Sequence, residues 1–165
     1  MLNATKVRIY PTPEQEAFLN AQFGAVRFVY NKALHIISTQ YKRHGTKLRA
    51  KKDLKPLLAV AKKSRKYHWL KDYDSIALQQ ACINLDRAFQ NFFDPKLPAR
   101  YPRFKRKQGK QSSYHCTSIK VGEGDIKIPQ SHAHQGTNPS KDHGHAEKYH
   151  LNPYHHWQIF CLVAD

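Results

Sequence analysis

A row of amide and guanidinium side chains recurs along one stretch of the chain: Gln80, Asn84, Arg87 and Asn91. Intervals of four, three and four residues place such a row on one face of a helix. Amides and arginine form paired hydrogen bonds with base edges in nucleic-acid grooves. The row therefore predicts a groove-reading surface, with an ordinary solvated helix face as the alternative. Asp86 is close by in the sequence and does not favour contact with phosphate.

A second set of functional side chains lies in YPRFKRKQGK, residues 101–110. Cations neutralise phosphates and aromatic rings stack on unpaired bases, so this composition predicts contact with nucleic acid. A flexible charged linker is the alternative. The segment KKSRKYHW, residues 62–69, is a second candidate of the same kind. The residues that we single out in the first segment are Tyr101, Arg103, Phe104, Lys105, Arg106, Lys107 and Lys110.

Patterns for catalysis and metal binding are sparse. A two-metal nuclease needs several carboxylates that converge on one site, whereas the acids here fall at expected helix starts and turns. Structural zinc sites usually combine histidine with cysteine in an ordered frame, which the histidine-rich C-terminal part does not offer. We therefore expect no catalytic residue, no metal and no cofactor. The histidines concerned are His132, His134, His143, His145, His155 and His156.

Net charge favours a polyanionic partner. The 165 residues carry 28 Lys and Arg against 12 Asp and Glu, a formal net charge of +16. Basic side chains release counterions from phosphates, although a soluble protein that happens to be basic is the alternative. Residues 1–128 hold 26 of the basic residues, whereas residues 129–165 hold two, with seven of the eleven histidines. Two sequence populations therefore meet near Pro129.

The sequence also suggests a compartment. It contains no apolar run near the roughly 18 residues that span a membrane, and no signal-peptide pattern. Its three cysteines, Cys82, Cys116 and Cys161, are far apart, which favours reduced thiols. We expect a cytoplasmic prokaryotic protein, nucleoid-associated when bound, with no membrane partner. The oligomeric state stays open.

A strand and a long helix are predicted at the N-terminus. Residues 5–10 alternate in polarity like a half-buried strand. Thr12, Pro13 and Gln15 then form a capping box with proline at the first helical position. Apolar residues follow at intervals of four and three, which defines one buried helix face. They are Leu19, Phe23, Val26, Tyr30, Ala33 and Ile37.

A second strong helix is predicted to begin at Asp74 or Ser75 and to end before Pro95. It carries the amide and guanidinium row on the side away from its apolar face. Residues 119–128 are predicted to form a β-hairpin, with Ile119 and Val121 opposite Ile126 and Ile128. The apolar face of the helix comprises Leu78, Cys82, Leu85, Phe89 and Phe92.

Three motifs resemble the N-terminal part of the TnpB family of transposon-encoded proteins. They are KVRIYPTPEQEAFL with FGAVRFVYNKAL, WLKDYDSIALQQACINLDRAFQNFF, and YPRFKRK, in the same order as in the family. The similarity covers roughly residues 2–128. Family members are regarded as transposases and as RNA-guided DNA endonucleases, so the resemblance implies DNA and a guide-type RNA as partners.

The resemblance also implies roles for individual residues. Gln79 and Gln80 would be near a duplex motif in the DNA, and Arg103, Lys105 and Arg106 would contact backbone. The family's metal-binding carboxylates belong to a RuvC-like domain further along, which this chain does not reach. We therefore expect a nucleic-acid-binding fragment that is not an enzyme on its own. The alternative is a stand-alone, non-cleaving DNA- or RNA-binding regulator of a transposon.

The expected fold is α+β. A helical, helix-turn-helix-like recognition lobe would be inserted in an incomplete wedge-type β-barrel, with an irregular C-terminal tail. Residues 1–10 would form the first wedge strand, residues 11–95 the helical region, residues 96–128 the basic loop and wedge strands, and residues 129–165 the tail. A shift of one base near codon 128 would turn the tail into barrel-like sequence, which predicts a frameshift there.

Overall fold

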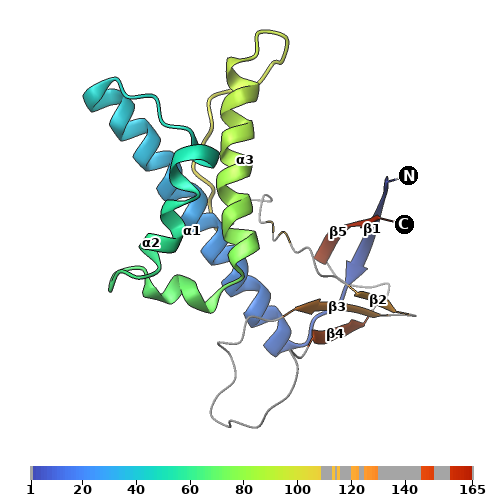
Figure 1. Ribbon diagram of the computed structural model, residues 1–165. Coiled ribbons are helices and arrows are strands. Elements are labelled where there is room, and N and C mark those ends of the chain that lie inside the picture. The colour runs from blue at the N-terminus through green and yellow to red at the C-terminus, as the bar shows by residue number, and fades with distance from the viewer. Residues whose placement is uncertain are drawn as a thin grey trace. The chain divides into compact units, whose positions relative to one another are not determined.

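Thr12 and Gln15 start the longest element of the computed structural model through reciprocal hydrogen bonds. The Thr12 N–H donates to Gln15 Oε1 at 3.0 Å, and the Gln15 N–H donates to Thr12 Oγ1 at 3.3 Å. These bonds confirm the predicted capping box, because each satisfies a donor that a helix start leaves unpaired. Helix α1 then runs over Pro13–His44 (Figure 1). Gly45 follows the helix, with a φ of 66° that favours glycine.

The structure describes residues 2–108, 113, 115, 120–122, 125–129, 146–150 and 157–164. Contacts divide the chain into two units, one of residues 20–115 and one of residues 1–19 with 116–165. We refer to the first as the helical unit and to the second as the strand unit. None of the helices in the described ranges combines the length and apolar character of a membrane span.

Four more helical elements follow α1 in the helical unit. They are the π-helix η1 (Ala50–Leu54), helix α2 (Leu57–Ala61), the 3-10 helix η2 (His68–Asp72) and helix α3 (Ser75–Phe93). Asp74 caps α3, because its side chain accepts a hydrogen bond from the Ile76 N–H at 2.8 Å. The predicted start of the second helix is therefore confirmed.

One apolar core joins these helices. Its deepest side chains include Leu34 of α1, Leu70 of η2, and Leu78 and Leu85 of α3, each at most 2% exposed. Ala50 and Leu54 of η1 belong to the same cluster. The predicted apolar faces of both long helices are largely confirmed, although Phe23, Phe89 and Phe92 are only partly buried. This core fixes α1, η1 and α3 against one another.

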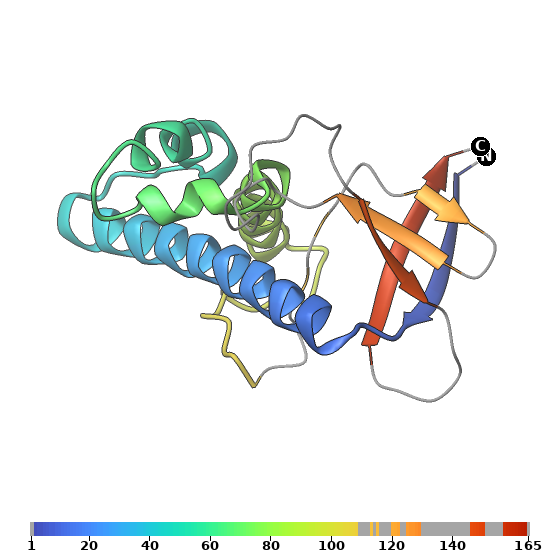
Figure 2. The same cartoon turned by 90° about the horizontal axis from the view of Figure 1, so that it is seen from below.

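The strand unit contains two antiparallel sheets. Strand β1 (Leu2–Ile9) pairs with β5 (Trp157–Ala164), from Leu2 opposite Ala164 to Ile9 opposite Trp157. Strands β2 (Lys120–Gly122), β3 (Asp125–Pro129) and β4 (Ala146–His150) form the other sheet in the order β2-β3-β4 (Figure 2). Val121 pairs with Ile126, as the predicted hairpin requires, while Ile119 lies outside the described residues.

The expected incomplete wedge-type β-barrel is wrong. A barrel needs a closed ring in which each strand is hydrogen-bonded on both edges. Among the described strands, β1 and β5 pair only with each other, and β2, β3 and β4 form a separate sheet. The part of the chain whose side chains are described, residues 10–108 with 113 and 115, consists of helices and irregular segments and adds no strand that could close a barrel.

The expected irregular tail is also corrected, because β4 and β5 fall within residues 129–165. β-Branched and aromatic residues such as those of WQIFCLVA favour strands, and β1 supplies a partner edge for β5. The four-part division of the chain and the frameshift near residue 128 stay predictions. The nucleotide sequence of the gene would test the frameshift.

Candidate nucleic-acid interface

A single side-chain amide on α1 fixes the basic segment 101–107. Asn31 Nδ2 donates to the Lys105 carbonyl oxygen at 2.9 Å, and the Lys105 N–H donates to Asn31 Oδ1 at 2.8 Å. Both backbone polar groups of Lys105 are therefore satisfied by one residue, although the segment has no helical or strand pairing. This clamp holds Lys105 against α1, which favours a positioned segment over the flexible-linker alternative, and nucleic-acid contact by the segment stays a prediction.

The Lys105 side chain packs inward on α1. Its Nζ lies 4.7 Å from the centre of the Tyr30 ring, a cation–π distance. Loss of hydration on burial lowers the pKa of Lys105, and burial raises the pKa of Tyr30. Lys105 therefore anchors the segment, and contact between its ammonium and phosphate stays a prediction.

The neighbours of Lys105 face solvent. Arg103, Phe104, Arg106 and Lys107 are all exposed, and 56% of Phe104 is accessible. Pro102 is buried. Pro102 and the half-buried Lys105 therefore face the helices. The three remaining cations and the Phe104 ring are left at the surface. That arrangement suits phosphate contact and base stacking.

Tyr101 begins the segment in a fixed orientation at the end of α3. Its hydroxyl lies 2.9 Å from Ser38 Oγ, and its ring meets the rings of Phe89 and Phe92 edge-on, at centroid distances of 5.6 and 5.4 Å. Aromatic edge contacts of this kind contribute to packing. Because 46% of Tyr101 is exposed, part of its ring stays available to a ligand.

The predicted row on α3 is opposite the core. Asn84 and Arg87 are exposed, and Gln79 and Gln80 are partly buried. Gln80 Nε2 donates to Asn84 Oδ1 at 2.9 Å, which holds the two amides side by side. The structure thus presents amides and a guanidinium on one outward face, and base reading by them stays a prediction.

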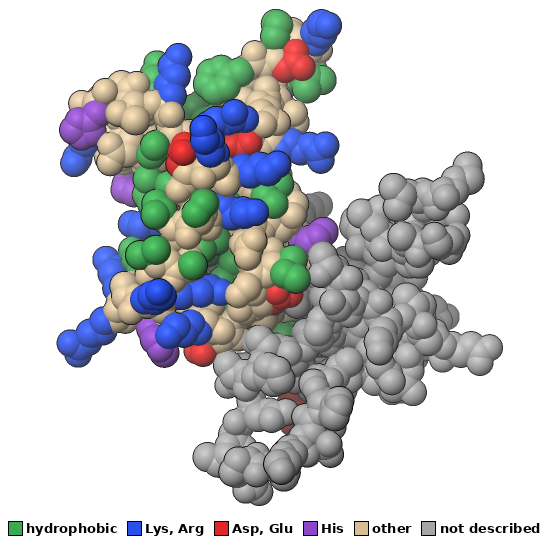
Figure 3. Space-filling model, viewed as in Figure 1, with side chains coloured by type: hydrophobic (Ala, Val, Ile, Leu, Met, Phe, Trp, Pro, Cys, Tyr) green, Lys and Arg blue, Asp and Glu red, His purple; other side chains and the backbone are tan. Residues whose placement is uncertain are grey.

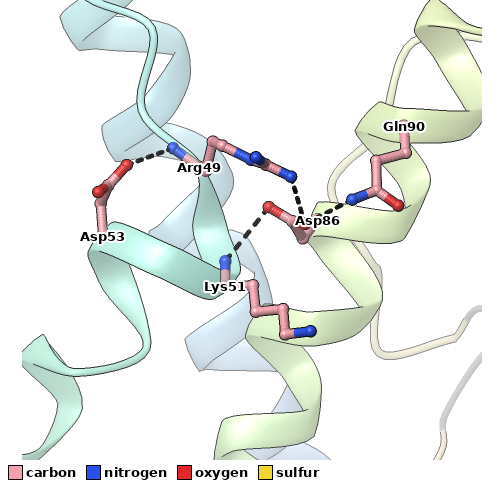
Figure 4. A network of polar contacts seen from close by, with 5 residues as sticks. All are labelled: Arg49, Lys51, Asp53, Asp86 and Gln90. Atoms are coloured by element: carbon pink, nitrogen blue, oxygen red, sulfur yellow. Dashed lines mark hydrogen bonds and ion pairs between the residues drawn. The ribbon is translucent and has the colours of Figure 1, made fainter.

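Asp86 has a different position from its neighbour Arg87. It turns inward and is 5% exposed, and its carboxylate contacts Arg49, the Lys51 backbone and Gln90 (Figure 4). The sequence indicated only that Asp86 does not favour contact with phosphate, and it did not predict this burial. Its place four residues after the buried Cys82 is the signal that could have located it at the core edge.

The role of Asn31 is only weakly indicated in the sequence. It follows Tyr30 of the apolar face, so it is at the margin of the buried stripe, where either solvent or a partner could satisfy its amide. Lys110 and the six tail histidines considered as metal ligands lie outside the described residues. Within the described ranges, no three His, Cys, Asp or Glu side chains gather closely enough to hold a metal ion.

The second basic segment, residues 62–69, uses its aromatic residues for packing. Trp69 meets Phe28 edge-on at 5.0 Å, and Tyr67 is 5.8 Å from the same ring. Lys62 donates to Ser75 Oγ at 2.6 Å, and partial burial lowers its pKa. Lys63, Arg65 and Lys66 remain exposed. Trp69 is also 37% exposed, but its ring packs edge-on against Phe28, whereas 56% of Phe104 is accessible.

Cationic side chains predominate on the described face of the helical unit. Figure 3 shows Lys and Arg side chains distributed over its helices, with few acidic ones between them. Residues 1–46 match the family model described as a helix-turn-helix domain, of the IS605 OrfB type. In this chain the described part of that range holds β1 and the continuous helix α1. This match places the chain with proteins that carry the helix-turn-helix domain of the IS605 OrfB type.

Three relatives define the family. Virulence protein VsdF of Salmonella dublin is 69% identical over 116 residues, which cover 67% of this chain and 98% of that protein. A "Putative RNA-guided DNA endonuclease" of Streptomyces pristinaespiralis is 37% identical over 115 residues. InsQ of Escherichia coli K12, which bears the same description, is 32% identical over 129 residues. The chain belongs to the OrfB/TnpB family and corresponds to an N-terminal fragment of it.

Coverage differs among these relatives. The matches span 69% and 77% of this chain but only 28% and 31% of the Streptomyces and Escherichia proteins. By contrast, nearly all of VsdF is matched. The names of the two longer relatives describe endonucleases, and those names refer to proteins of which this chain spans less than a third.

Proposed function

We propose that the helical unit binds DNA and a guide-type RNA through two surfaces. The segment 101–107 contacts the sugar–phosphate backbone and unpaired bases, and the outward row on α3 contacts base edges. One observation carries this proposal: Asn31 fixes both backbone groups of Lys105, so that Arg103, Phe104 and Arg106 project to solvent from a rigid support. A prepositioned cationic and aromatic surface loses less entropy on binding than a flexible linker.

Salt-dependent binding tests the proposal. Purified protein is titrated into labelled single-stranded RNA and duplex DNA between about 50 and 200 mM salt, and affinity should fall steeply because counterions are released. Arg103→Ala with Arg106→Ala should weaken binding to every sequence and reduce the salt slope by about 2. Lys71→Ala with Lys96→Ala removes the same charge from exposed positions outside both proposed surfaces; it serves as the matched control and should reduce affinity less.

The row on α3 requires a different readout. Gln80→Ala should change the preference among duplex sequences while leaving the salt slope unchanged, because an amide that reads a base edge neutralises no phosphate. Binding of both variants with the parent's affinity and preference would contradict the assigned surfaces. Absence of binding to any polynucleotide at low salt would contradict the proposed function as a whole.

We also propose that this chain does not cut DNA by itself. Metal-dependent cleavage needs converging carboxylates. Among the described side chains Asp86 is the one buried carboxylate, and Arg49, Lys51 and Gln90 already engage it. Incubation with DNA and RNA in the presence of Mg²⁺ or Mn²⁺ tests this; metal-dependent product formation that survives repurification would overturn it.

A stand-alone regulator is the second candidate function. The match to 98% of VsdF favours it, because a protein made almost entirely of this region exists among the relatives. Such a regulator should melt cooperatively and bind a particular nucleic-acid sequence tightly. A broad melt with sequence-independent binding would instead favour a fragment whose specificity depends on other parts of the family's proteins.

A further inference from the structure

A buried carboxylate on α3 organises the basic stretch that follows α1. Asp86 Oδ1 accepts the Lys51 backbone N–H at 3.3 Å, and Asp86 Oδ2 accepts Gln90 Nε2 at 2.9 Å. The Arg49 guanidinium lies 3.8 Å from Asp86 Oδ2. Figure 4 shows these three partners converging on Asp86 from η1 and α3. One side chain therefore ties a loop, a π-helix and α3 together.

The same stretch is fixed from its other side. Asp53 Oδ2 accepts the Arg49 N–H at 2.7 Å, and Ala50 and Leu54 enter the core. π-Helical turns are rare and often occur at functional sites. Here the turn sends its small and apolar residues inward, which leaves four cations exposed: Lys47, Arg49, Lys51 and Lys52. We call these four residues the η1 cations.

We infer that Asp86 is a positioning residue that aligns the η1 cations for contact with the phosphate backbone. This inference rests on the proposed function and adds a second backbone-binding surface to it. Arg49 keeps 63% of its side chain exposed while its ion pair fixes its direction. Lys51 meets Asp86 through its backbone N–H, and Figure 4 shows its ammonium pointing away from that carboxylate.

Removing the Asp86 charge should lower the affinity for nucleic acid, which is opposite to the effect of charge alone. By charge alone, removing an acid from a phosphate-binding surface should strengthen binding. If Asp86 positions the η1 cations, Asp86→Asn should weaken binding roughly tenfold and lower the salt slope by about 1 to 2, because aligned phosphate contacts are lost. Glu14→Gln is the matched control; it removes one exposed acid from the first turn of α1 and should leave affinity equal or slightly higher.

Binding is measured well below the melting temperature, with circular dichroism confirming helix content for each variant. A purely structural role would lower the melting temperature and leave the salt slope of the folded protein unchanged. If folded Asp86→Asn binds nucleic acid as tightly as the parent or more tightly, with an unchanged salt slope, the inference is wrong. The proposed function still stands in that case, because the parent protein binds nucleic acid. A parent that binds no nucleic acid overturns both.

Lysine footprinting on the parent covers the case in which Asp86→Asn does not fold. Free and nucleic-acid-saturated protein are acetylated briefly, and the modified sites are identified by mass spectrometry. We expect Lys47, Lys51 and Lys52 to be protected several-fold by the bound polynucleotide. Unchanged reactivity of all three at saturation overturns the inference without any substitution.

Discussion

The helical unit fixes two basic segments by different means. The segment 101–107 depends on a neutral amide, Asn31, which bonds both backbone groups of one residue. The stretch around η1 depends on a buried carboxylate, Asp86, which combines a backbone hydrogen bond with an ion pair. In both cases the anchor is on a long helix at the edge of the core, and most of the cations face solvent. The comparison shows that an irregular basic segment needs few anchors when a helix supports it.

The two anchors should respond differently to conditions. Hydrogen bonds between neutral groups carry little dependence on ionic strength, whereas an ion pair with a partly exposed guanidinium is weakened by salt. The segment 101–107 should therefore keep its geometry in salt better than the η1 stretch. Both anchors also depend on the apolar core that holds α1, η1 and α3 together.

The largest effect should follow from damage to the shared core. Leu78 is fully buried on α3 in the cluster that contains both α1 and η1. Leu78→Ala should lower the free energy of unfolding by about 2–5 kcal/mol, because it removes buried contacts and leaves a cavity. Chemical denaturation measures this loss. A change below that of an exposed control, Ile76→Ala at 45% exposure, would contradict the described core.

Removing the neutral anchor should have the next largest effect. Asn31→Ala leaves the Lys105 N–H and carbonyl without their partner, which should cost about 1–3 kcal/mol of unfolding free energy. It should also raise the mobility of segment 101–107, measured as faster amide exchange at Lys105. The matched control is Asn91→Ala, an exposed asparagine on α3. Equal stability of the two variants would show that the clamp contributes nothing.

Lys105→Met tests whether Lys105 stabilises the protein through the packing of its side chain on α1 or through its ammonium group. Methionine keeps an apolar stem on Tyr30 and removes a charge whose hydration is lost on burial. Because burial lowers the folded-state pKa of Lys105, the charged form opposes folding at neutral pH, and this cost declines as the pH rises toward 10.5. The variant should therefore melt at the same or a higher temperature near pH 7. A clear loss of stability would mean that the ammonium itself is required.

The smallest effect concerns the thiol in the core. Burial raises the pKa of Cys82 from 9.0 to about 11. Its contribution to stability is complete below pH 9 and declines as the pH rises toward 11, since the unfolded thiol ionises first. Site-resolved alkylation near pH 8 should therefore leave Cys82 unmodified until the protein unfolds. Rapid labelling of Cys82 in folded protein would contradict its burial.

Local signals in the sequence predicted the helices well. The Thr12–Gln15 box, the Asp74 cap and the apolar spacings depend on neighbours within four residues, and the structure confirms them. The β-barrel was wrong because strand pairing joins segments far apart in the chain. No local pattern indicates that β1 pairs with β5 rather than with a barrel neighbour.

The candidate surfaces also combine features that the local sequence predicted with features that depend on distant residues. Composition alone identified the cations and aromatic residues of segment 101–107 and the α3 row. It did not identify Asn31 or Asp86, and it gave Lys105 the same role as Arg103 and Arg106. The orientation of Lys105 depends on a residue 74 positions away, which no spacing rule within the segment could reveal.

The amino-acid sequence by itself determined the family, the starts of the two long helices and the excess of positive charge, because each is written in local composition and spacing. Only the tertiary structure decided which basic residues face solvent and which are packed against α1. Burial and hydrogen bonding depend on what distant segments bring to the same place, and the Asn31 and Asp86 anchors exist only after α1, η1 and α3 have packed together.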